Sequence, residues 1–448
     1  MKRLYYVFVL MLATASWAQQ GGENISIGNY FSSALAGTAD GYESDVAIAV
    51  EDIAATRDLV WNIWRESVNA FDEEKLFPIE ELENRKSSSW TLPQALEPNA
   101  VMPFYWGCNE FPMKGDGKYP LFVYMHGSGD KAQEWETGIG LSLRRFYSPA
   151  VYFVPQIPNA YGEYYRWAIQ SKQWAWEKLL RLSFLEDAID ANKIYFFGIS
   201  EGAYGSQRLA SFYADYLAGA GPMAGGEPLK NAPAENLANI AFSLRTGEKD
   251  YGFGRNYMTY IAAKTLDSLR TAHPHLYDHK IELIPGMGHG INYEATTPWL
   301  VQYERNPHPA YFYWEDYDMY GRHRNGFYNL RVNEPSRENE QQRTCYEVSR
   351  RGNTIEITVK NVTYTTTESL YNIPMVFKKD FTPATKGNIT IFLDEESIDL
   401  TKPVTIIVNG RKAFNGKVKP CTKAMAESCA LFFDPERVFP AAVTVDIK

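Results

Sequence analysis

The chain has 448 residues, a formal net charge of −9 and a pI near 5.5. We expect more than one domain, because single hydrophobic cores stop growing at roughly 250–300 residues. The acidic balance argues against nucleic acid and anionic membrane surfaces as partners.

Residues 1–18 have the pattern of a secretory signal peptide. Met1-Lys2-Arg3 carries positive charge, residues 4–12 are apolar, and Ser16-Trp17-Ala18 places small residues where a signal peptidase cleaves. The apolar run is shorter than the roughly 20 residues that span a bilayer, so we expect no membrane span. We predict cleavage before Gln19 and a soluble exported protein, either periplasmic or extracellular.

Residues 19–98 are expected to form a helical N-terminal extension. Between Val46 and Trp64 apolar runs alternate with charges, and neither Gly nor Pro occurs. This pattern predicts a helix over roughly residues 40–72.

A regular alternation of strands and helices follows. Expected strands lie at residues 101–106, 121–125, 150–154, 194–199, 239–244 and 280–284. Expected helices lie between them at residues 173–188, 203–216 and 255–272. This order predicts an α/β catalytic domain over residues 99–306, with a parallel sheet covered by helices on both faces.

The pattern changes beyond residue 306. Residues 354–359, 388–391 and 443–447 alternate with period two, as half-buried strands do. Asn409-Gly410 separates two short strand-like runs and predicts a tight hairpin with a primed turn. Residues 307–448 are therefore expected to form a mostly β, sandwich-like accessory domain.

The cysteines and a group of histidines leave alternatives open. The four cysteines allow three complete disulfide pairings, or they are isolated buried thiols, and the sequence does not choose between these. His273, His275 and His279 crowd one expected connection, but no Cys or carboxylate lies at ligand spacing, so we expect no metal site.

The segment Gly198-Ile199-Ser200-Glu201-Gly202 carries the strongest chemical signal. It follows an aromatic, apolar run and precedes an expected helix. A serine in such a Gly-x-Ser-x-Gly segment lies on a sharp strand-to-helix turn that exposes its hydroxyl, and the glycines avoid clashes there. This arrangement predicts Ser200 as a nucleophile that attacks a carbonyl.

A nucleophilic serine needs a base and an acid that orients the base, and here both follow later strands in the order Ser, acid, His. His289 lies in a glycine-rich loop just after the strand expected at 280–284. Asp250 and Glu248 both follow the strand expected at 239–244. Asp250 is favoured as the acid, because it lies further into the loop and has the shorter side chain, and Glu248 is the alternative.

The attack creates an oxyanion that needs preorganised donors. One donor is expected to be the backbone N–H of Glu201, the residue after the nucleophile. The other is expected from the loop His126-Gly127-Ser128-Gly129, through the N–H of Gly127 or Ser128. The side chain of His126 is expected to brace this loop and not to transfer protons.

Four segments together resemble the α/β-hydrolase superfamily: His126-Gly127-Ser128-Gly129, Gly198-Ile199-Ser200-Glu201-Gly202, Gly247-Glu248-Lys249-Asp250 and Gly286-Met287-Gly288-His289. The closer resemblance, over residues 100–305, is to secreted polyhydroxybutyrate-depolymerase-like and feruloyl-esterase-like carbohydrate esterases. The C-terminal region resembles that of two-domain bacterial esterases of polysaccharide degradation, including a pectin methylesterase type.

The resemblance implies a secreted serine esterase that needs no metal or organic cofactor and acts on esters of plant cell-wall polysaccharide. Pectin-type methyl esters rank first, and acetyl and feruloyl esters are alternatives. Glu201 departs from the family pattern, because many relatives carry Met, Gln or His there. A carboxylate beside the nucleophile disfavours some anionic substrates.

Candidate substrate-binding residues lie in the loops where a cleft would open. Trp135, Arg166 and Trp167 follow the second and third expected strands, and Arg255 follows the acid. The alternative is that the tryptophans pack internally and Arg166 is a surface charge. The aromatic and basic segment over residues 311–324 is expected either to cover the site or to form the interdomain seam.

Two other functions are compatible with the sequence. A serine peptidase of the prolyl-oligopeptidase kind usually carries an N-terminal propeller, for which residues 19–100 are too short. A non-catalytic carbohydrate-binding protein on a hydrolase scaffold is the other, and the complete set of serine, acid and histidine argues against it.

Overall fold

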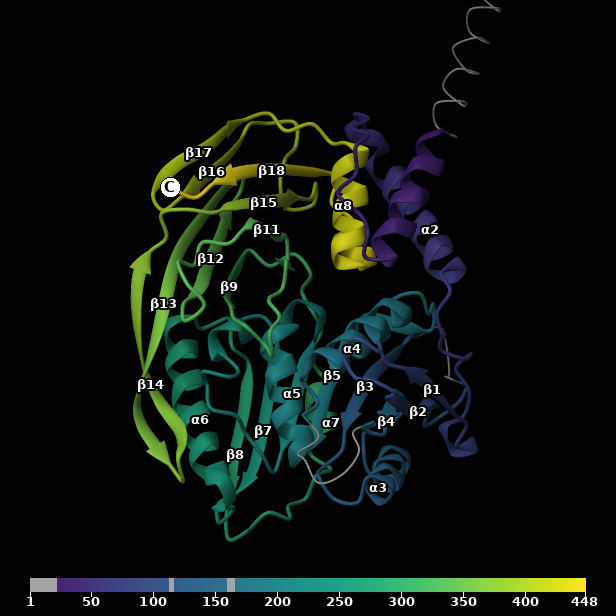
Figure 1. Cartoon of the computed structure of the whole chain (residues 1–448), viewed down its shortest axis with the longest axis vertical. Helices are drawn as coiled ribbons and strands as arrows, with labels where there is room; N and C mark the ends of the chain where they lie inside the picture. The colour runs from purple at the N-terminus through teal and green to yellow at the C-terminus, as the bar shows by residue number, and fades with distance from the viewer. Residues whose placement is uncertain (1–21, 113–116, 159–165) are drawn as a thin grey trace, which may run out of the picture.

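The computed structural model describes residues 22–112, 117–158 and 166–448 (Figure 1). The expected signal peptide and its cleavage site lie outside the described residues. No helix in the described ranges combines the length and apolar character needed to cross a membrane.

Eight strands form one sheet in the order β1-β2-β4-β3-β5-β6-β7-β8. They are β1 (Ser87–Thr91), β2 (Val101–Cys108), β3 (Tyr119–Met125), β4 (Val151–Pro155), β5 (Ile189–Ile199), β6 (Gly219–Met223), β7 (Ala241–Gly247) and β8 (His279–Ile284). The pairs β1–β2 and β2–β4 are antiparallel, and all later pairs are parallel. The largely parallel sheet confirms the α/β class. It begins at β1, before the boundary expected at residue 99.

Helices cover both faces of this sheet (Figure 1). Along β3, Leu121 and Val123 join one core cluster, whereas Phe122 and Tyr124 join another, as alternating side chains of a strand must. The first cluster includes side chains of α4 (Gln170–Ser183), α5 (Glu201–Phe212) and α6 (Arg255–Ala272). The second includes side chains of α3 (Lys131–Arg144) and α7 (Thr296–Leu300). A strand buried on both faces explains why β3 is continuously apolar.

The central strand β6 has no strand-like sequence. It reads Gly-Ala-Gly-Pro-Met, and Gly and Pro normally argue against a central strand. A Cβ at Gly219 would lie 2.7 Å from the carbonyl oxygen of Ala241, and one at Gly221 would clash with Thr296. The glycines are required because β7 and α7 pack directly against the backbone here.

The N-terminal region differs from the single long helix expected over residues 40–72. Residues 22–35 and α2 (Ile53–Ala70) are helical, and residues 38–49 between them form no helix and carry one isolated bridge, from Ala47 to Cys421. The backbone of Val46 accepts a hydrogen bond from the N–H of Thr422 (2.9 Å). Pairing with the distant C-terminal segment therefore replaces helical hydrogen bonding over this stretch.

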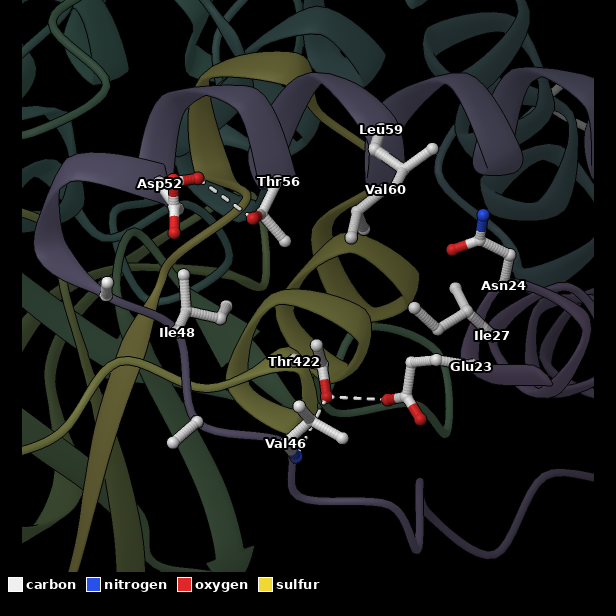
Figure 2. Close-up of a pocket in the computed structure, with 12 residues that line it drawn as sticks. Glu23, Asn24, Ile27, Val46, Ile48, Asp52, Thr56, Leu59, Val60 and Thr422 are labelled. Atoms are coloured by element: carbon white, nitrogen blue, oxygen red, sulfur yellow. Dashed lines mark hydrogen bonds between the residues drawn. The ribbon is translucent and has the colours of Figure 1, made fainter. Parts of the chain in front are cut away.

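Both N-terminal helices lie beside α8 (Thr422–Phe432), a helix close to the C-terminus (Figure 1). Figure 2 shows the pocket between them, where the Thr422 hydroxyl donates to a Glu23 carboxylate oxygen (2.7 Å). The same carboxylate accepts hydrogen bonds from the hydroxyls of Tyr42 and Ser44. The N-terminal extension is thus attached to the C-terminal region through a carboxylate that binds three hydroxyl groups.

The chain beyond residue 306 forms two further sheets, of four strands (β10-β11-β15-β18) and six strands (β17-β16-β13-β12-β9), with β14 paired to β13. The strands are β9 (Tyr311–Asp316), β10 (Gly326–Phe327), β11 (Leu330–Glu334), β12 (Arg343–Arg351), β13 (Thr354–Leu370), β14 (Ile373–Pro383), β15 (Asn388–Leu393), β16 (Val404–Val408), β17 (Arg411–Gly416) and β18 (Ala441–Asp446). Asn409 and Gly410 connect β16 to β17 with φ of 49° and 77°. These sheets are compatible with the expected sandwich-like accessory domain.

A buried cluster of charges joins this region to the α/β sheet. Asp215, in the short helix after α5, accepts hydrogen bonds from the guanidinium groups of Arg324 and Arg437. Arg437 also donates to Asp434 (2.7 Å), and Arg305 donates to Asp434 (2.5 Å). Burial alone would raise the pKa of Asp434, but the charges of Arg305 and Arg437 outweigh it and lower the pKa to about 2. Both carboxylates are therefore held in their charged form.

The four cysteines form no disulfide in the described structure, and two of the three grouped histidines make contacts within the protein. All four cysteines are free thiols. His279 is hydrogen-bonded to the Tyr277 carbonyl (2.8 Å) and to Asp267 (3.2 Å), and His273 stacks on Tyr311. Within the described ranges, no group of three or more His, Cys, Asp or Glu side chains is arranged to hold a metal ion.

Candidate active site

Ser200 lies on the turn between β5 and α5 with φ 56° and ψ −112°. A non-glycine residue with positive φ is strained, and such strain is typical of functional positions. A Cβ at Gly198 would lie 2.5 Å from the carbonyl oxygen of Gly202, and a Cβ at Gly202 would clash with the carbonyl of Met125. The two glycines allow the turn to form this close to β3, and it leaves the Ser200 hydroxyl accessible.

The structure brings Ser200, His289 and Asp250 together from three loops at one edge of the sheet. His289 Nε2 lies 3.0 Å from Ser200 Oγ, and His289 Nδ1 lies 2.7 Å from Asp250 Oδ2. An ionised carboxylate only accepts hydrogen bonds, so Nδ1 carries the proton and Nε2 is free to accept one from the serine. The Asp250 side chain is buried, and the imidazole is half-exposed.

Glu248 occupies a different position from Asp250. Its carboxylate accepts a hydrogen bond from the N–H of Gly286 (2.8 Å), and its carbonyl accepts one from the Asn256 side chain (3.0 Å). Glu248 therefore ties the start of the His289 loop to the acid loop. The imidazole faces Asp250, in keeping with the preference derived from the sequence.

The side chain of Arg255 is largely buried and forms an ion pair with Asp250, the candidate acid of the site. Its Nη1 donates to Asp250 Oδ1 (2.9 Å), and its Nε donates to the hydroxyl of Tyr204 (2.8 Å). Both oxygens of Asp250 are consequently occupied, one by the imidazole and one by the guanidinium. Arg255 lines the pocket beside Ser200, as expected, and its hydrogen bond also holds Asp250 in position, a role that the sequence did not predict.

In the loop after β3, the two candidate oxyanion donors, Gly127 and Ser128, have different surroundings. The N–H of Gly127 donates to a carboxylate oxygen of Glu134 (3.2 Å), whereas Ser128 lines the pocket beside Ser200. Glu201 is the first residue of α5, where a backbone N–H has no partner within the helix. The geometry therefore favours Ser128 and Glu201 as the donors and assigns Gly127 to holding the loop.

His126 braces this loop from inside the protein. Its Nε2 accepts a hydrogen bond from the N–H of Ile157 (3.1 Å), so the ring proton lies on Nδ1, 2.7 Å from the carbonyl oxygen of Gly127. Burial lowers the pKa of His126 to about 4. The ring therefore stays neutral near pH 7 and holds the backbone of the loop.

Trp135 and Trp167 do not line the pocket. The Trp135 ring stacks on Tyr105 (centroids 4.2 Å apart), and its Nε1 donates to the Val154 carbonyl (2.8 Å). Trp167 is 1 % exposed, and its Nε1 donates to the His126 carbonyl (3.0 Å). Both tryptophans are packing residues, which corrects their expected role in substrate binding.

An open pocket of about 300 Å³ lies beside Ser200. Arg166 lines it, as expected, and its backbone N–H donates to the carboxylate of Glu201 (3.1 Å). Burial raises the pKa of the Glu201 carboxyl above its usual value, and the charge of Glu227 adds to the rise. The wall next to the nucleophile is therefore polar, with the carboxyl groups of Glu201 and Glu227 beside the side chains of Arg166 and Arg208.

The pocket also contains residues that the sequence alone does not identify as part of a site. Arg208 donates to Glu227 (2.6 Å) and to the hydroxyl of Tyr320 (2.6 Å), and all three line the pocket. Tyr320 belongs to the segment over residues 311–324, which thus reaches the site, whereas Arg324 of the same segment lies in the buried ion cluster. Ile373, the first residue of β14, lines the pocket as well. No local pattern marks these residues, because they meet only in the folded chain.

Comparison with family models and with curated proteins finds no match. Among solved structures, a thermostable esterase aligns over 49 % of this chain and 63 % of its own, at 19 % identity and a TM-score of 0.39. A ferulic acid esterase from Anaeromyces mucronatus aligns over 48 % of this chain and 89 % of its own, at 15 % identity and a TM-score of 0.35. An S-formylglutathione hydrolase from Staphylococcus aureus aligns over 48 % of this chain and 98 % of its own, at 12 % identity and a TM-score of 0.33. At these values the likeness is too distant to assign an activity.

Proposed function

We propose that this protein is a serine carboxylic-ester hydrolase. The observation that carries the proposal is the hydrogen-bonded series Ser200 Oγ, His289 Nε2, His289 Nδ1 and Asp250 Oδ2, with separations of 3.0 and 2.7 Å at the side of an open pocket. These distances lie within the range over which a base takes a proton from a nucleophile.

In the proposed reaction, Ser200 Oγ attacks the ester carbonyl while His289 Nε2 takes the hydroxyl proton. The oxyanion forms next to the N–H groups of Ser128 and Glu201, where removing one such donor typically costs about 3–4 kcal/mol. The imidazolium then protonates the departing alcohol, which leaves an acyl group on Ser200. Water, deprotonated by the same imidazole, attacks the acyl-enzyme and releases the acid.

Asp250 and Arg255 act on the imidazole and not on the substrate. Asp250 keeps the Nδ1 tautomer and stabilises the imidazolium that forms during attack. Arg255 holds the second oxygen of Asp250 and so fixes the plane of the carboxylate. We call Arg255 a positioning residue for this reason.

The proposed substrates are esters of plant cell-wall polysaccharide, with pectin-type methyl esters first and acetyl or feruloyl esters as alternatives. The pocket supports a sugar substrate because it combines charged groups, such as Arg166 and the Arg208–Glu227 pair, with apolar side chains, such as Phe253. Export of the protein, which the signal-like first residues favour, is part of the same proposal.

The test compares wild-type protein with Ser200→Ala and Ser32→Ala. Turnover of p-nitrophenyl acetate and release of methanol, acetate and ferulate from cell-wall polysaccharides are measured together. Ser200→Ala should lose at least about 10³-fold in kcat, as expected for a missing nucleophile. Ser32→Ala, which changes an exposed helix hydroxyl bound to Gly28, should keep wild-type activity.

Two results would replace the esterase proposal with another function. If wild type and Ser200→Ala are equally inert on every ester and both bind glycan, the protein is a carbohydrate-binding protein. If wild type cleaves peptides and Ser200→Ala does not, the protein is a serine peptidase.

A further inference from the structure

The hairpin of β13 and β14 projects beyond the sheet to which it belongs. Residues 354–362 of β13 pair with β12, whereas residues 363–370 of the same strand extend past β12 and pair with β14. Tyr371 and Asn372 join the two strands with φ of 52° and 63°, as in a two-residue primed turn. Figure 1 shows the hairpin running alongside α6, toward the part of the molecule that carries the α/β sheet.

A two-stranded hairpin is marginally stable on its own, so this projecting part needs packing partners. Met375 is 1 % exposed, and a Cβ at Gly254 would lie 2.8 Å from Met375 Cε and 2.9 Å from Leu370 Cδ2. The hydroxyl of Tyr257 donates to Glu368 (2.8 Å). The buried Met375 side chain and the Tyr257–Glu368 hydrogen bond attach the tip to the start of α6.

The hairpin tip docks where the acid loop ends and α6 begins. Gly254 has φ of 70° and directly precedes Arg255, which binds Asp250. The residue before it, Phe253, is 46 % exposed and lines the pocket beside Ser200. A segment more than a hundred residues away in sequence therefore packs against the loop that carries the proposed catalytic acid.

Ile373, the first residue after the turn, lines the same pocket as Ser200. Together with Phe253 and Met258 it supplies apolar surface, while Arg208 and Glu227 supply charged groups. A pyranose ring needs both, because its C–H groups pack on apolar side chains and its hydroxyls bond to charged ones. An aromatic acyl group would use only the apolar side chains.

We infer that the tip of the β13–β14 hairpin is a substrate-specificity element that binds a pyranose ring next to the ester. The inference rests on the proposed ester hydrolase function. Ile373, Phe253 and Met258 contact the C–H groups of the ring, and the Arg208–Glu227 pair bonds to its hydroxyls. The C-terminal region thus selects sugar esters over small esters.

The test uses full-length Ile373→Ala and a matched control, Phe381→Ala, at the far end of the same strand, where the ring is 45 % exposed. Substrates are methyl-esterified trigalacturonate, acetylated xylotriose, methyl ferulate and p-nitrophenyl acetate. For whichever sugar ester the wild type hydrolyses best, Ile373→Ala should lower kcat/KM, relative to p-nitrophenyl acetate, by about tenfold. Phe381→Ala should leave this ratio as in wild type.

An unchanged ratio in a folded Ile373→Ala protein would overturn the inference and leave the esterase proposal standing. An equal loss on methyl ferulate would also overturn it, because the apolar wall would then select an aromatic acyl group. Circular dichroism and thermal unfolding of both variants show whether they are folded.

A binding measurement separates this inference from the esterase proposal. In a Ser200→Ala background, Ile373→Ala should raise the Kd by about tenfold in calorimetry. The ligand is whichever of methyl-esterified trigalacturonate and acetylated xylotriose binds more tightly to the Ser200→Ala protein. If the wild type hydrolyses no ester but this loss of binding is seen, the esterase proposal fails and the specificity element stands. If the Kd does not change, the specificity element is refuted.

Discussion

Neutralising Asp215 should destabilise the protein severely. Asp215 is 0 % exposed and accepts hydrogen bonds from Arg324 and Arg437, which are also buried. Asp215→Asn keeps the shape of the side chain, so no cavity forms, and only the charge is lost. The wild type has two carboxylates against three buried guanidinium groups, and the variant has only the carboxylate of Asp434. Arg324 keeps the Phe212 carbonyl, the aromatic ring of Tyr213 and a neutral amide as partners, but no carboxylate.

Removing one member of a buried ion pair typically costs 3–5 kcal/mol, because the remaining charge stays buried without compensation. We therefore expect Asp215→Asn to lose about 3–5 kcal/mol of unfolding free energy in urea, followed by tryptophan fluorescence. The matched control is Asp399→Asn, which breaks an exposed pair with Lys402 (2.6 Å) and should leave the unfolding free energy close to that of wild type. A loss below about 1 kcal/mol for Asp215→Asn would refute the idea that this ion cluster holds the two regions together.

Three further changes test the site and the fold. Asp250→Asn should lower kcat on p-nitrophenyl acetate by about 10⁴-fold, because the imidazole loses its orienting carboxylate, whereas Glu248→Gln should cost less than about tenfold; a larger loss for Glu248→Gln would make Glu248 the acid. Asp434 has a folded-state pKa of about 2 against 3.8 for an ordinary aspartate, so it stabilises the fold above about pH 4 and loses this contribution as the pH falls toward 2. The difference in urea midpoint between wild type and Asp434→Asn should shrink over that range, and a constant difference would contradict the assignment. Gly202→Ala should abolish turnover and lower the melting temperature, because the new Cβ clashes with the Met125 backbone, while Gly140→Ala, with open space around it, should be neutral or stabilising by up to about 1 kcal/mol. Equal effects of the two alanines would show that the turn at Ser200 tolerates a side chain.

The sequence predicts those residues of the site that a short, recognisable sequence pattern identifies. Ser200, Asp250 and His289 each follow directly after an apolar strand, and the parallel arrangement of those strands brings their carboxyl ends to one edge. Gly198 and Gly202 also carry a local signal, because the turn needs them whatever lies around it. The α/β class and the positions of most strands follow from the same kind of information.

Other features depend on contacts between distant segments, and the sequence pattern misses them or misplaces them. β6 consists of glycine, alanine, proline and methionine because neighbours pack on its backbone, and this requirement is invisible in the strand itself. Trp135 and Trp167 lie in loops near the site, yet their indole N–H groups bond to backbone carbonyls inside the protein. The alternating stretch before Ile53 looks helical but pairs with residues near Thr422.

Two of the contacts between the C-terminal region and the α/β part of the chain show how the regions depend on one another. At one, Asp434 and Arg437 bind Arg305 and Asp215 in a buried ion cluster that exists only when both regions are folded. At the other, the β13–β14 hairpin packs Met375 against Gly254, at the end of the acid loop. Separating the regions would break the buried ion pairs and expose the apolar tip, and burial of the Met375 side chain alone contributes about 1.5–3 kcal/mol. The C-terminal region is therefore a structural part of the proposed catalytic unit, because its hairpin packs against the end of the loop that holds Asp250 and supplies Ile373 to one wall of the pocket.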